Sequence, residues 1–430
     1  MTTQRYGVGL ALAAVALLFA QGCQTSQLPQ RMETPGAATS PGEHSPPTPT
    51  MLALRRNLLN PEVESLFLRN MDELFETRTV THGREVFELS SSAAPLPTYE
   101  FQGQTRSYAD FAERTNTNAF LIVRDGRITF EDYRNRSTAE TRFASFSMAK
   151  SVTSILIGIA IERGLIASID DPVVNYVPEL RGSGYDGVSL RNILQMRSGV
   201  AYEERYDFGA NPSLAAIIHE QAVVRNIERF ADRARTVTRA AEPGARFNYA
   251  TLDTAVLGWA LENAAHRSMA DLTSEWLWKP AGMERDGFWI ADGPVGVGRE
   301  LSGMGFNATL RDYARIGLLM LNGGKVDERQ VIPPDWVRQS TQMTAFDGPS
   351  NVNFGVGYGF QWWQVDDNPG AFSAVGLAGQ FIYVAPQSRT VIVKLSYFPV
   401  ANEGPMMAET LAFFRAVANH NASPATTGTP

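Results

Sequence analysis

A serine and a lysine three residues apart lie at the start of a long apolar stretch. Ser147 and Lys150 are followed by residues that are apolar nearly all round until Glu162, which is typical of a buried helix. A helix over 148–163 places the two side chains on one face, one turn apart. Burial favours the neutral form of a lysine. A neutral amine can take the proton of a neighbouring serine, so the pair has the chemistry of a nucleophile and its base.

Lysine is rare in this chain, which makes its position informative. The 38 basic residues include four lysines, Lys150, Lys279, Lys325 and Lys394, and the rest are arginines. Arginine cannot lose its proton at working pH, whereas lysine can. An isolated Ser-x-x-Lys pattern more often means a serine that caps a helix and a lysine that points to solvent. The buried helix expected here favours the chemical interpretation.

Two distant stretches could complete an acyl-transfer site. Tyr249 follows the turn Glu242-Pro243-Gly244 and directly precedes an expected helix, where a tyrosine on its own is more often structural. The segment Gly376-Leu377-Ala378-Gly379-Gln380 enters an expected strand. Its two glycines permit close backbone approach and leave N–H groups free, although alone they indicate only a tight turn.

Weaker candidates lie in the loops. Glu203, Glu204 and Asp207 could line a cleft, although a solvated acidic loop is the commoner meaning of such a cluster. Trp362 and Trp363 could form a wall for a substrate or pack in the core, and the sequence favours neither.

Together, in this order and spacing, these residues resemble the serine β-lactamase and penicillin-recognising superfamily. Within it, the sequence is most similar to the branch of class C β-lactamases, family VIII carboxylesterases and 6-aminohexanoate-dimer hydrolases. The Gly-Leu-Ala-Gly-Gln segment is most similar to the last of these. The resemblance runs from about Leu54 to the C-terminal helix, and it is carried by the stretches 147–164, 194–200, 243–258, 309–317 and 357–363.

The resemblance implies a role for each motif residue. Ser147 would be the nucleophile, with Lys150 and Tyr249 jointly accepting its proton, and which of the two is the formal base stays open. The backbone N–H groups of Ser147 and Leu377 would form the oxyanion hole. The substrate would contact Thr251, Gly376, Gly379, Gln380 and Trp363.

Two departures from the family pattern narrow the activity. Thr251 occupies the asparagine position of the Tyr-x-Asn motif, so an amide that would hold a substrate carbonyl is missing. The Lys-Thr-Gly motif is absent, because no Thr-Gly follows Lys394. In β-lactamases that motif helps to hold the substrate carboxylate. Its loss counts against β-lactam or D-alanyl peptide cleavage more than against ester or simple amide cleavage.

The resulting prediction is a serine hydrolase that cleaves ester or linear amide bonds through an acyl-enzyme on Ser147. It would act as a carboxylesterase or as an amidase like the 6-aminohexanoate-dimer hydrolases. One alternative is a β-lactamase or D-amino peptidase that acts on cell-wall substrates. Another is a non-catalytic envelope lipoprotein that uses the fold for binding.

The elements that must position these residues indicate an α+β fold. The runs 119–124 and 127–133, joined by Asp125-Gly126, predict a β-hairpin, and 380–384 with 390–395 predict a second strand pair. Between them the sequence is mostly helical, so we expect one antiparallel sheet built from both ends of the chain and flanked by helices, with a helical lobe inserted. The resemblance implies a β-lactamase/transpeptidase-like fold. The predicted helices are 190–196 with Ser189 as N-cap, 214–231, 251–264, 269–277, 309–321 with a capping box at Thr309, and 406–418.

We expect one hydrolase domain over 53–420, with the sheet lobe at about 53–165 and 320–420 and the helical lobe at about 166–319. With 430 residues, of which 44% are hydrophobic, the chain can bury such a core. The net charge of −7 and the lack of a basic cluster argue against nucleic acid as a partner. The five histidines lack ligand spacing and there is one cysteine, so we expect no metal, no disulfide framework and no cofactor.

The N-terminal segment indicates export. Arg5 precedes an apolar run over 7–20 that is too short to span a bilayer and suits a signal peptide. The run ends Phe19-Ala20-Gln21-Gly22-Cys23, which resembles a bacterial lipoprotein box except that Ala20 stands where leucine is commoner. Acyl chains on Cys23 would anchor the protein to a membrane, as a periplasmic or cell-envelope lipoprotein of a bacterium. The alternative is an ordinary signal peptide that leaves a free thiol.

The chain ends outside the domain have the composition of disordered segments. Residues 24–52 are mostly Pro, Thr, Ser and Gly, and residues 421–430 form a polar tail. We therefore expect a disordered linker followed by the hydrolase domain and a short disordered tail.

Overall fold

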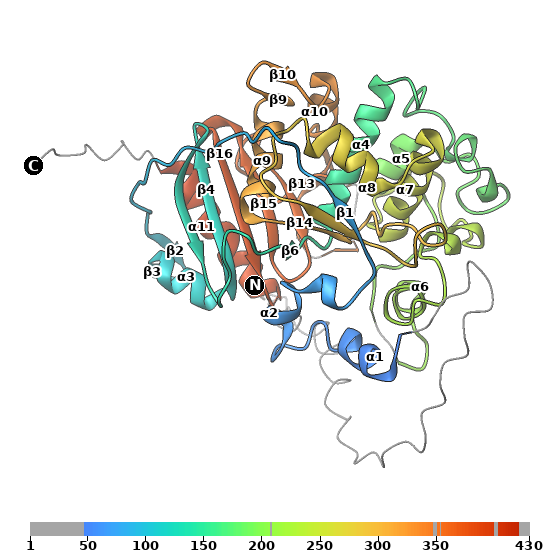
Figure 1. Ribbon diagram of the computed structural model, residues 1–430, viewed down its shortest axis with the longest axis horizontal. Helices are drawn as coiled ribbons and strands as arrows, with labels where there is room; N and C mark the ends of the chain where they lie inside the picture. Colours follow the sequence, from blue (N-terminus) through green and yellow to red (C-terminus); the bar gives the residue numbers. More distant parts are fainter. Residues whose placement is uncertain (1–46, 207–208, 347–350, 353, 400–402, 421–430) are drawn as a thin grey trace, which may run out of the picture.

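The computed structural model describes residues 47–206, 209–346, 351–352, 354–399 and 403–420 (Figure 1). The expected signal peptide with Cys23, most of the linker and the tail lie outside the described residues. Helix α1, Pro49–Arg56, begins inside the segment that we expected to be disordered. It forms because Thr48 accepts a hydrogen bond from the N–H of Met51 and proline occupies the first helical position.

The main sheet has eight antiparallel strands in the order β11-β12-β13-β14-β15-β16-β4-β5. β16 pairs with β4, so the sheet joins segments from both ends of the chain, as Figure 1 shows. This confirms the predicted sheet and the α+β class. The strands are β4 Thr117–Arg124, β5 Arg127–Tyr133, β11 Thr344–Ala345, β12 Gly357–Tyr358, β13 Trp363–Gln364, β14 Phe372–Gly376, β15 Gln380–Ala385 and β16 Thr390–Ser396.

Helices cover both faces of this sheet. Ile382 of β15 lies beside Gly317 of α9, Leu310–Leu321. The neighbouring residues Phe381 and Tyr383 instead contact Phe414 of α11, Glu403–Asn419. Because alternate residues of a strand point to opposite faces, the two helices lie on opposite sides of the sheet.

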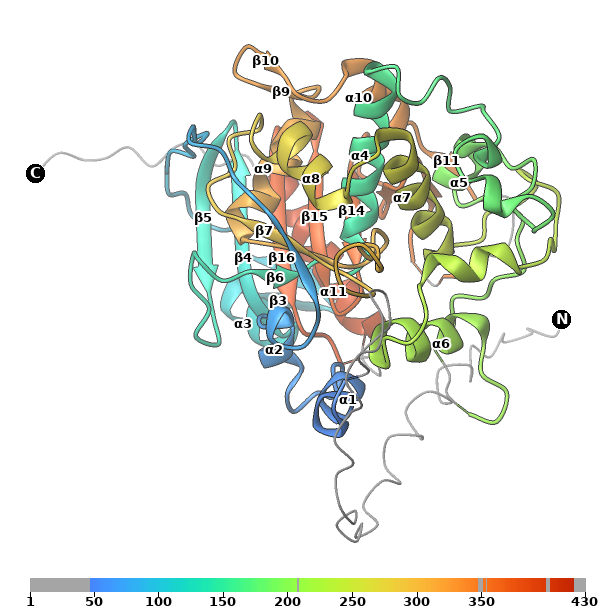
Figure 2. The same ribbon diagram turned by 45° about the vertical axis from the view of Figure 1, so that its right-hand side comes forward.

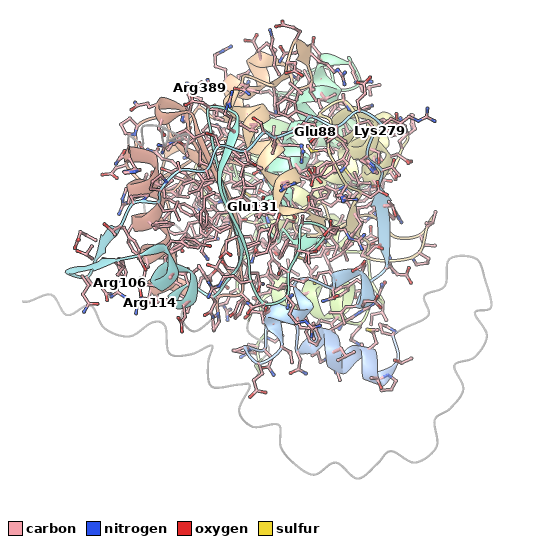
Figure 3. The ribbon with its side chains drawn as sticks, turned by 60° about the vertical axis from the view of Figure 1, so that its left-hand side comes forward. Glu88, Arg106, Arg114, Glu131, Lys279 and Arg389 are labelled. Atoms are coloured by element: carbon pink, nitrogen blue, oxygen red, sulfur yellow. The ribbon has the colours of Figure 1, made fainter. Side chains whose placement is uncertain are left out.

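α11 is also tied to α3, Tyr108–Arg114, at the edge of the molecule. Arg114, labelled in Figure 3, donates two hydrogen bonds of 2.8 and 3.0 Å to Glu409 of α11. The C-terminal helix is therefore fixed by charge as well as by aromatic packing.

A smaller sheet with the order β1-β7-β8-β6 leads into the functional site. Its strands are β1 Thr77–Val80, β6 Phe143–Ala144, β7 Gly287–Ile290 and β8 Phe306–Ala308. The boundary of the helical lobe differs from the expected residue 319, because β7 and β8 already belong to this sheet and α9 packs on β15 and β16. α4, Met148–Glu162, packs between α7, Thr251–Ala265, of the helical lobe and β14 of the main sheet (Figure 2).

Several predicted helices are shorter than expected. The helix at 190–196 ends at Leu194, and the one at 214–231 ends at Ile218 and continues as a π-helix over His219–Val224. The one at 269–277 likewise changes to a π-helix after Leu272. The remaining bounds are α2 Glu64–Phe67, α5 Leu190–Leu194, α6 Leu214–Ile218, α8 Met269–Leu272, α10 Pro334–Ser340, β2 Tyr99–Phe101, β3 Gln104–Arg106, β9 Lys325–Val326 and β10 Arg329–Gln330. Within the described part of the chain, no helix is long and apolar enough to cross a membrane.

Candidate active site

Ser147 lies where the chain turns from β6 into α4. Phe146, directly before it, has a φ of +42°, a left-handed conformation that is unusual for a bulky residue. The turn is fixed by the N–H of Ser145, which donates to the carbonyl of Phe306 at 2.9 Å. Ser147 is therefore placed at the N-terminus of α4, and its side chain is only half-buried.

Lys150 is one turn further along α4 and is almost completely buried. Its Nζ lies 3.0 Å from Ser147 Oγ, 2.9 Å from Thr251 Oγ1 and 2.8 Å from the carbonyl oxygen of Gly303. Burial lowers the pKa of Lys150 to about 8, although the charges of Glu204 and Asp253 act in the opposite direction. About a tenth of the amine is therefore neutral at pH 7, and the share rises as the pH approaches 8.

Tyr249 is the third predicted residue that the structure brings to this place. Its side chain is buried, and the Lys150 Nζ lies 4.9 Å from its ring centroid. Burial, followed by the charge of Glu204, raises the pKa of Tyr249, while a hydrogen-bond interaction with Ser147 opposes the rise. The phenol therefore stays protonated under conditions in which Lys150 loses its proton.

The backbone of Tyr249 is held by a residue that the sequence analysis missed. The N–H of Tyr249 donates to Asn351 Oδ1 at 2.8 Å, and Asn351 Nδ2 donates to the carbonyl of Tyr249 at 2.9 Å. The side-chain amide of Asn351 thus pairs with both the backbone N–H and the backbone carbonyl of Tyr249. Asn351 lies in a loop without hydrophobic periodicity, so no sequence signal singles it out.

Thr251 and Glu204 extend the network beyond the lysine. The N–H and the hydroxyl of Thr251 both donate to the Glu204 carboxylate, at 2.7 and 2.8 Å. Thr251, predicted as a substrate contact, is buried and accepts a hydrogen bond from Lys150. Of the three acidic loop residues, Glu204 thus lies at the site. Glu203 pairs with Arg205 at the surface, and Asp207 lies outside the described residues.

The turn between β14 and β15 approaches Ser147 from the sheet. A Cβ on Gly376 would lie 2.1 Å from the carbonyl oxygen of Ser145, so only glycine permits this contact. Among the described residues, no acceptor is found for the backbone N–H of Ser147 or for that of Leu377. Two N–H donors thus remain available beside the predicted nucleophile.

Gly379 and Gln380, which were predicted to contact a substrate, shape this turn. Gly379 has a φ of +82° and lies against the ring of Phe398. The buried Gln380 side chain donates to the carbonyls of Ala378 and Ser396 at 3.0 and 2.9 Å. These contacts fix the backbone that carries Leu377.

The two tryptophans pack in the core. Trp363 lies 5.2 Å from the ring of Tyr249 and 4.5 Å from that of Phe354, and it is 2% exposed. Trp362 is fully buried against Phe372. Trp363, predicted as a substrate contact, therefore packs against the ring of Tyr249.

The contacts of Lys394 are those of a structural residue. Its Nζ donates to the carbonyl of Thr115 at 2.9 Å and lies 4.5 Å from the ring centroid of Phe398. Burial lowers its pKa well below the ordinary lysine value. Its contacts thus give it no part in the Ser147 network. No group of three or more His, Cys, Asp or Glu side chains that could hold a metal ion is found among the described residues.

Several known proteins are similar to this chain. The Beta-lactamase family model matches residues 56–413. The 6-aminohexanoate-dimer hydrolase of Paenarthrobacter ureafaciens is 30% identical over 329 residues, which cover 74% of this chain and 80% of that protein.

Solved structures show the same fold at lower identity. A putative 6-aminohexanoate-dimer hydrolase from Bacillus anthracis superposes with a TM-score of 0.75 at 22% identity, covering 88% of this chain and 98% of its own. A family VIII carboxylesterase superposes with a TM-score of 0.55 at 17% identity, covering 72% of this chain and 95% of its own.

Proposed function

Because the chain belongs to the beta-lactamase family and is a serine hydrolase, we propose that it cleaves ester or linear amide bonds through an acyl-enzyme on Ser147. The observation that carries this proposal is the distance of 3.0 Å between Lys150 Nζ and Ser147 Oγ. The lysine is buried, and its pKa is lowered to about 8. A nucleophile thus lies within reach of a base whose neutral form is populated.

In the proposed acylation step, Lys150 acts as the base that accepts a proton, and Tyr249 acts as the acid that donates one. Neutral Lys150 takes the proton of Ser147 while Oγ forms a bond to the substrate carbonyl carbon and the carbonyl electrons move to oxygen. The N–H groups of Ser147 and Leu377 stabilise the resulting oxyanion. Tyr249, whose raised pKa keeps it protonated, donates its proton to the leaving oxygen or nitrogen as that bond breaks. Lys150 then returns its proton to Tyr249.

Deacylation repeats these transfers with water in place of the leaving group. Lys150 accepts a proton from water, and the resulting hydroxide attacks the acyl carbon. Lys150 then returns the proton to Ser147 Oγ as the bond between Oγ and the acyl carbon breaks and the acid leaves.

The substrate class is proposed from the relatives and from one missing motif. The curated relative is named for hydrolysis of a linear amide dimer. The chain lacks the Lys-Thr-Gly motif. The Nζ of Lys394 instead donates to the carbonyl of Thr115 and lies against two aromatic rings. Short-chain aryl esters and linear amides need no carboxylate-binding group, so they suit this site better than β-lactams do.

Turnover assays test this proposal. We expect the purified protein to hydrolyse p-nitrophenyl butyrate, and Ser147→Ala to abolish the reaction while the fold is retained. A linear dimer of 6-aminohexanoate tests amide cleavage. Nitrocefin should react slowly or not at all, and its rapid hydrolysis would contradict the proposed substrate class. Absence of ester and amide turnover in the wild type would contradict the proposal as a whole.

We also propose that the protein is exported and anchored by lipid at Cys23. The support is the apolar run over 7–20, which ends in a lipoprotein-like box with the chain's one cysteine. Cys23→Ser should release the protein from the membrane fraction of a bacterial host. Unchanged membrane association of this variant would contradict the anchor.

A further inference from the structure

Glu204 lies one hydrogen bond beyond the pair of Lys150 and Thr251. We propose that Glu204 is a positioning residue, which fixes the direction of the Thr251 hydroxyl and thereby points the lone pair of Lys150 at Ser147. This inference rests on the proposed function, because it assigns Lys150 as the base. It adds a residue outside the motifs that identify the site.

The argument follows from counting hydrogen atoms around Lys150. A neutral amine has two N–H donors and one lone pair. The carbonyl of Gly303, at 2.8 Å, can only accept. The Thr251 hydroxyl donates its one hydrogen to Glu204 Oε1 at 2.8 Å, so towards Lys150 its oxygen also accepts, at 2.9 Å. Both N–H donors are then used, and the lone pair faces Ser147 Oγ.

Glu204 is itself held firmly enough to do this. One carboxylate oxygen accepts from the Thr251 hydroxyl and from the hydroxyl of Tyr206, and the other accepts from the Thr251 N–H at 2.7 Å. Thr251 is the first residue of α7, whose N-cap, Ala250, has no side chain that could accept a hydrogen bond. Glu204 therefore supplies the missing cap, and the helix N-terminus favours its negative charge.

The dependence on Glu204 arises because a hydroxyl can donate or accept. Without a fixed acceptor, the Thr251 hydroxyl can turn and donate to the Lys150 lone pair, in competition with Ser147. The amine would then lie at the correct distance with its lone pair already occupied. Loss of Glu204 thus lowers the rate even if the fold is unchanged.

Glu204 also acts on the charge of Lys150. The charges that act on the lysine are those of Glu204 and of Asp253 in α7. The phenols nearby are Tyr249, beside the lysine, and Tyr206, whose hydroxyl donates to Glu204. Both carboxylates favour the ammonium form. Removing the charge of Glu204 should therefore move the acid limb of the pH profile to lower pH, whereas a purely structural role would lower the rate without this shift.

The test measures the rate of fluorophosphonate labelling from about pH 6 to about pH 10 for the full-length protein and its variants. Glu204→Gln keeps the size of the side chain and removes its charge. We expect a plateau rate lower by about 10- to 100-fold, with the acid limb displaced to lower pH. Glu203→Gln is the matched control and should behave as the wild type, because Glu203 pairs with Arg205 in solvent.

A second pair of variants, at Thr251, separates an effect on the positioning of Lys150 from an effect on folding. Thr251→Ser keeps the hydroxyl and should keep most of the rate, whereas Thr251→Val should lose it. Glu204→Gln should cost little more in the Thr251→Val background, because the two residues act through one hydrogen bond. The inference is overturned if the two losses multiply, or if Glu204→Gln has the wild-type plateau and limb. If the wild type is not labelled at all, the proposed function fails together with this inference.

Discussion

At the scale of single residues, the burial of one amine explains why this chain uses lysine at position 150. Three acceptors surround Nζ within 3.0 Å, and they satisfy all three hydrogens of an ammonium ion. The lowered pKa of about 8 then allows one proton to leave. An arginine would fill the space and keep its charge, so it could not replace the base.

The pKa of Lys150 predicts the pH dependence of activity. The neutral amine is the active form, so kcat/KM should rise with pH through about 8 and then reach a plateau, while the protonated enzyme below that pH is inactive. The pH profile of p-nitrophenyl butyrate hydrolysis, corrected for spontaneous hydrolysis, measures this limb. A profile that falls as the pH rises from neutrality to about 8 would contradict a lysine base.

The predicted trio of Ser147, Lys150 and Tyr249 meets at one place, whereas the hydrogen bonds that support these residues could not be predicted. Glu204 and Asn351 act through hydrogen bonds that span 47 and 102 residues of sequence. Both lie in loops, where neither helical nor strand periodicity marks the direction of a side chain. The spacing of Ser147 and Lys150, in contrast, is local and set by one helical turn.

At the scale of elements, the site depends on the contact between two turns. The β6–α4 turn carries Ser147, and the β14–β15 turn carries Leu377. They meet where Gly376 lies against the carbonyl of Ser145. The hydrogen bonds of Gln380 hold the second turn in this position. An oxyanion hole made from both turns therefore requires that this contact stay close.

Gly376→Ala should separate the two turns. Its Cβ would lie 2.1 Å from the carbonyl oxygen of Ser145, so the end of β14 must move and carry the Leu377 N–H with it. We expect a fall in kcat of about 100-fold, similar to the loss of one oxyanion donor.

Gly404→Ala is the control for this substitution, because a Cβ there meets no atom within 4 Å and the position is exposed on α11. Ester hydrolysis by the two variants, with thermal unfolding measured in parallel, checks the prediction. Equal kcat for both variants would show that the contact does not matter.

The sequence predicted elements best where local signals agree. The Asp125-Gly126 turn has φ values of +48° and +76°, as the hairpin requires, and Thr309 caps α9. The capping box itself is incomplete, because the Asp312 carboxylate accepts from the N–H groups of Glu284 and Arg285. Tertiary contacts of this kind, and the π-helical turns after α6 and α8, have no local sequence signature.

At the scale of the whole molecule, the pairing of β16 with β4 makes folding depend on contacts between distant parts of the chain. The site lies between the sheet and the helical lobe, since α4 contacts both β14 and α7. The segment before the first long strand also contributes, because the carbonyl of Leu68 accepts from the N–H of Ala144 in β6. The region 52–117 thus supports the strand that carries the chain to Ser147.

A buried carboxyl in that region predicts a pH-dependent stability. Glu64 of α2 is fully buried, and neither of its carboxyl oxygens has a hydrogen-bond partner among the described residues. Burial, and then the charge of Glu403, raises its pKa to about 8. The folded state therefore holds this proton when the unfolded chain has lost it, so stability falls as the pH rises towards 8.

Glu64→Gln should remove this dependence. We expect the variant to be more stable than the wild type by about 1 to 3 kcal/mol at about pH 9, with a smaller difference at about pH 5. Urea unfolding at both pH values measures the effect. Glu62→Gln, at an exposed position, is the matched control. An equal difference at both pH values would show that Glu64 does not titrate in this range.

The most direct test of the central claim is peptide mapping of the protein after reaction with a fluorophosphonate probe. We predict that one probe molecule attaches to the Oγ of Ser147, that Ser147→Ala is not labelled, and that Lys150→Ala is labelled far more slowly. Labelling of a different residue, or labelling of Ser147→Ala at the wild-type rate, would contradict the assignment of Ser147 as the nucleophile.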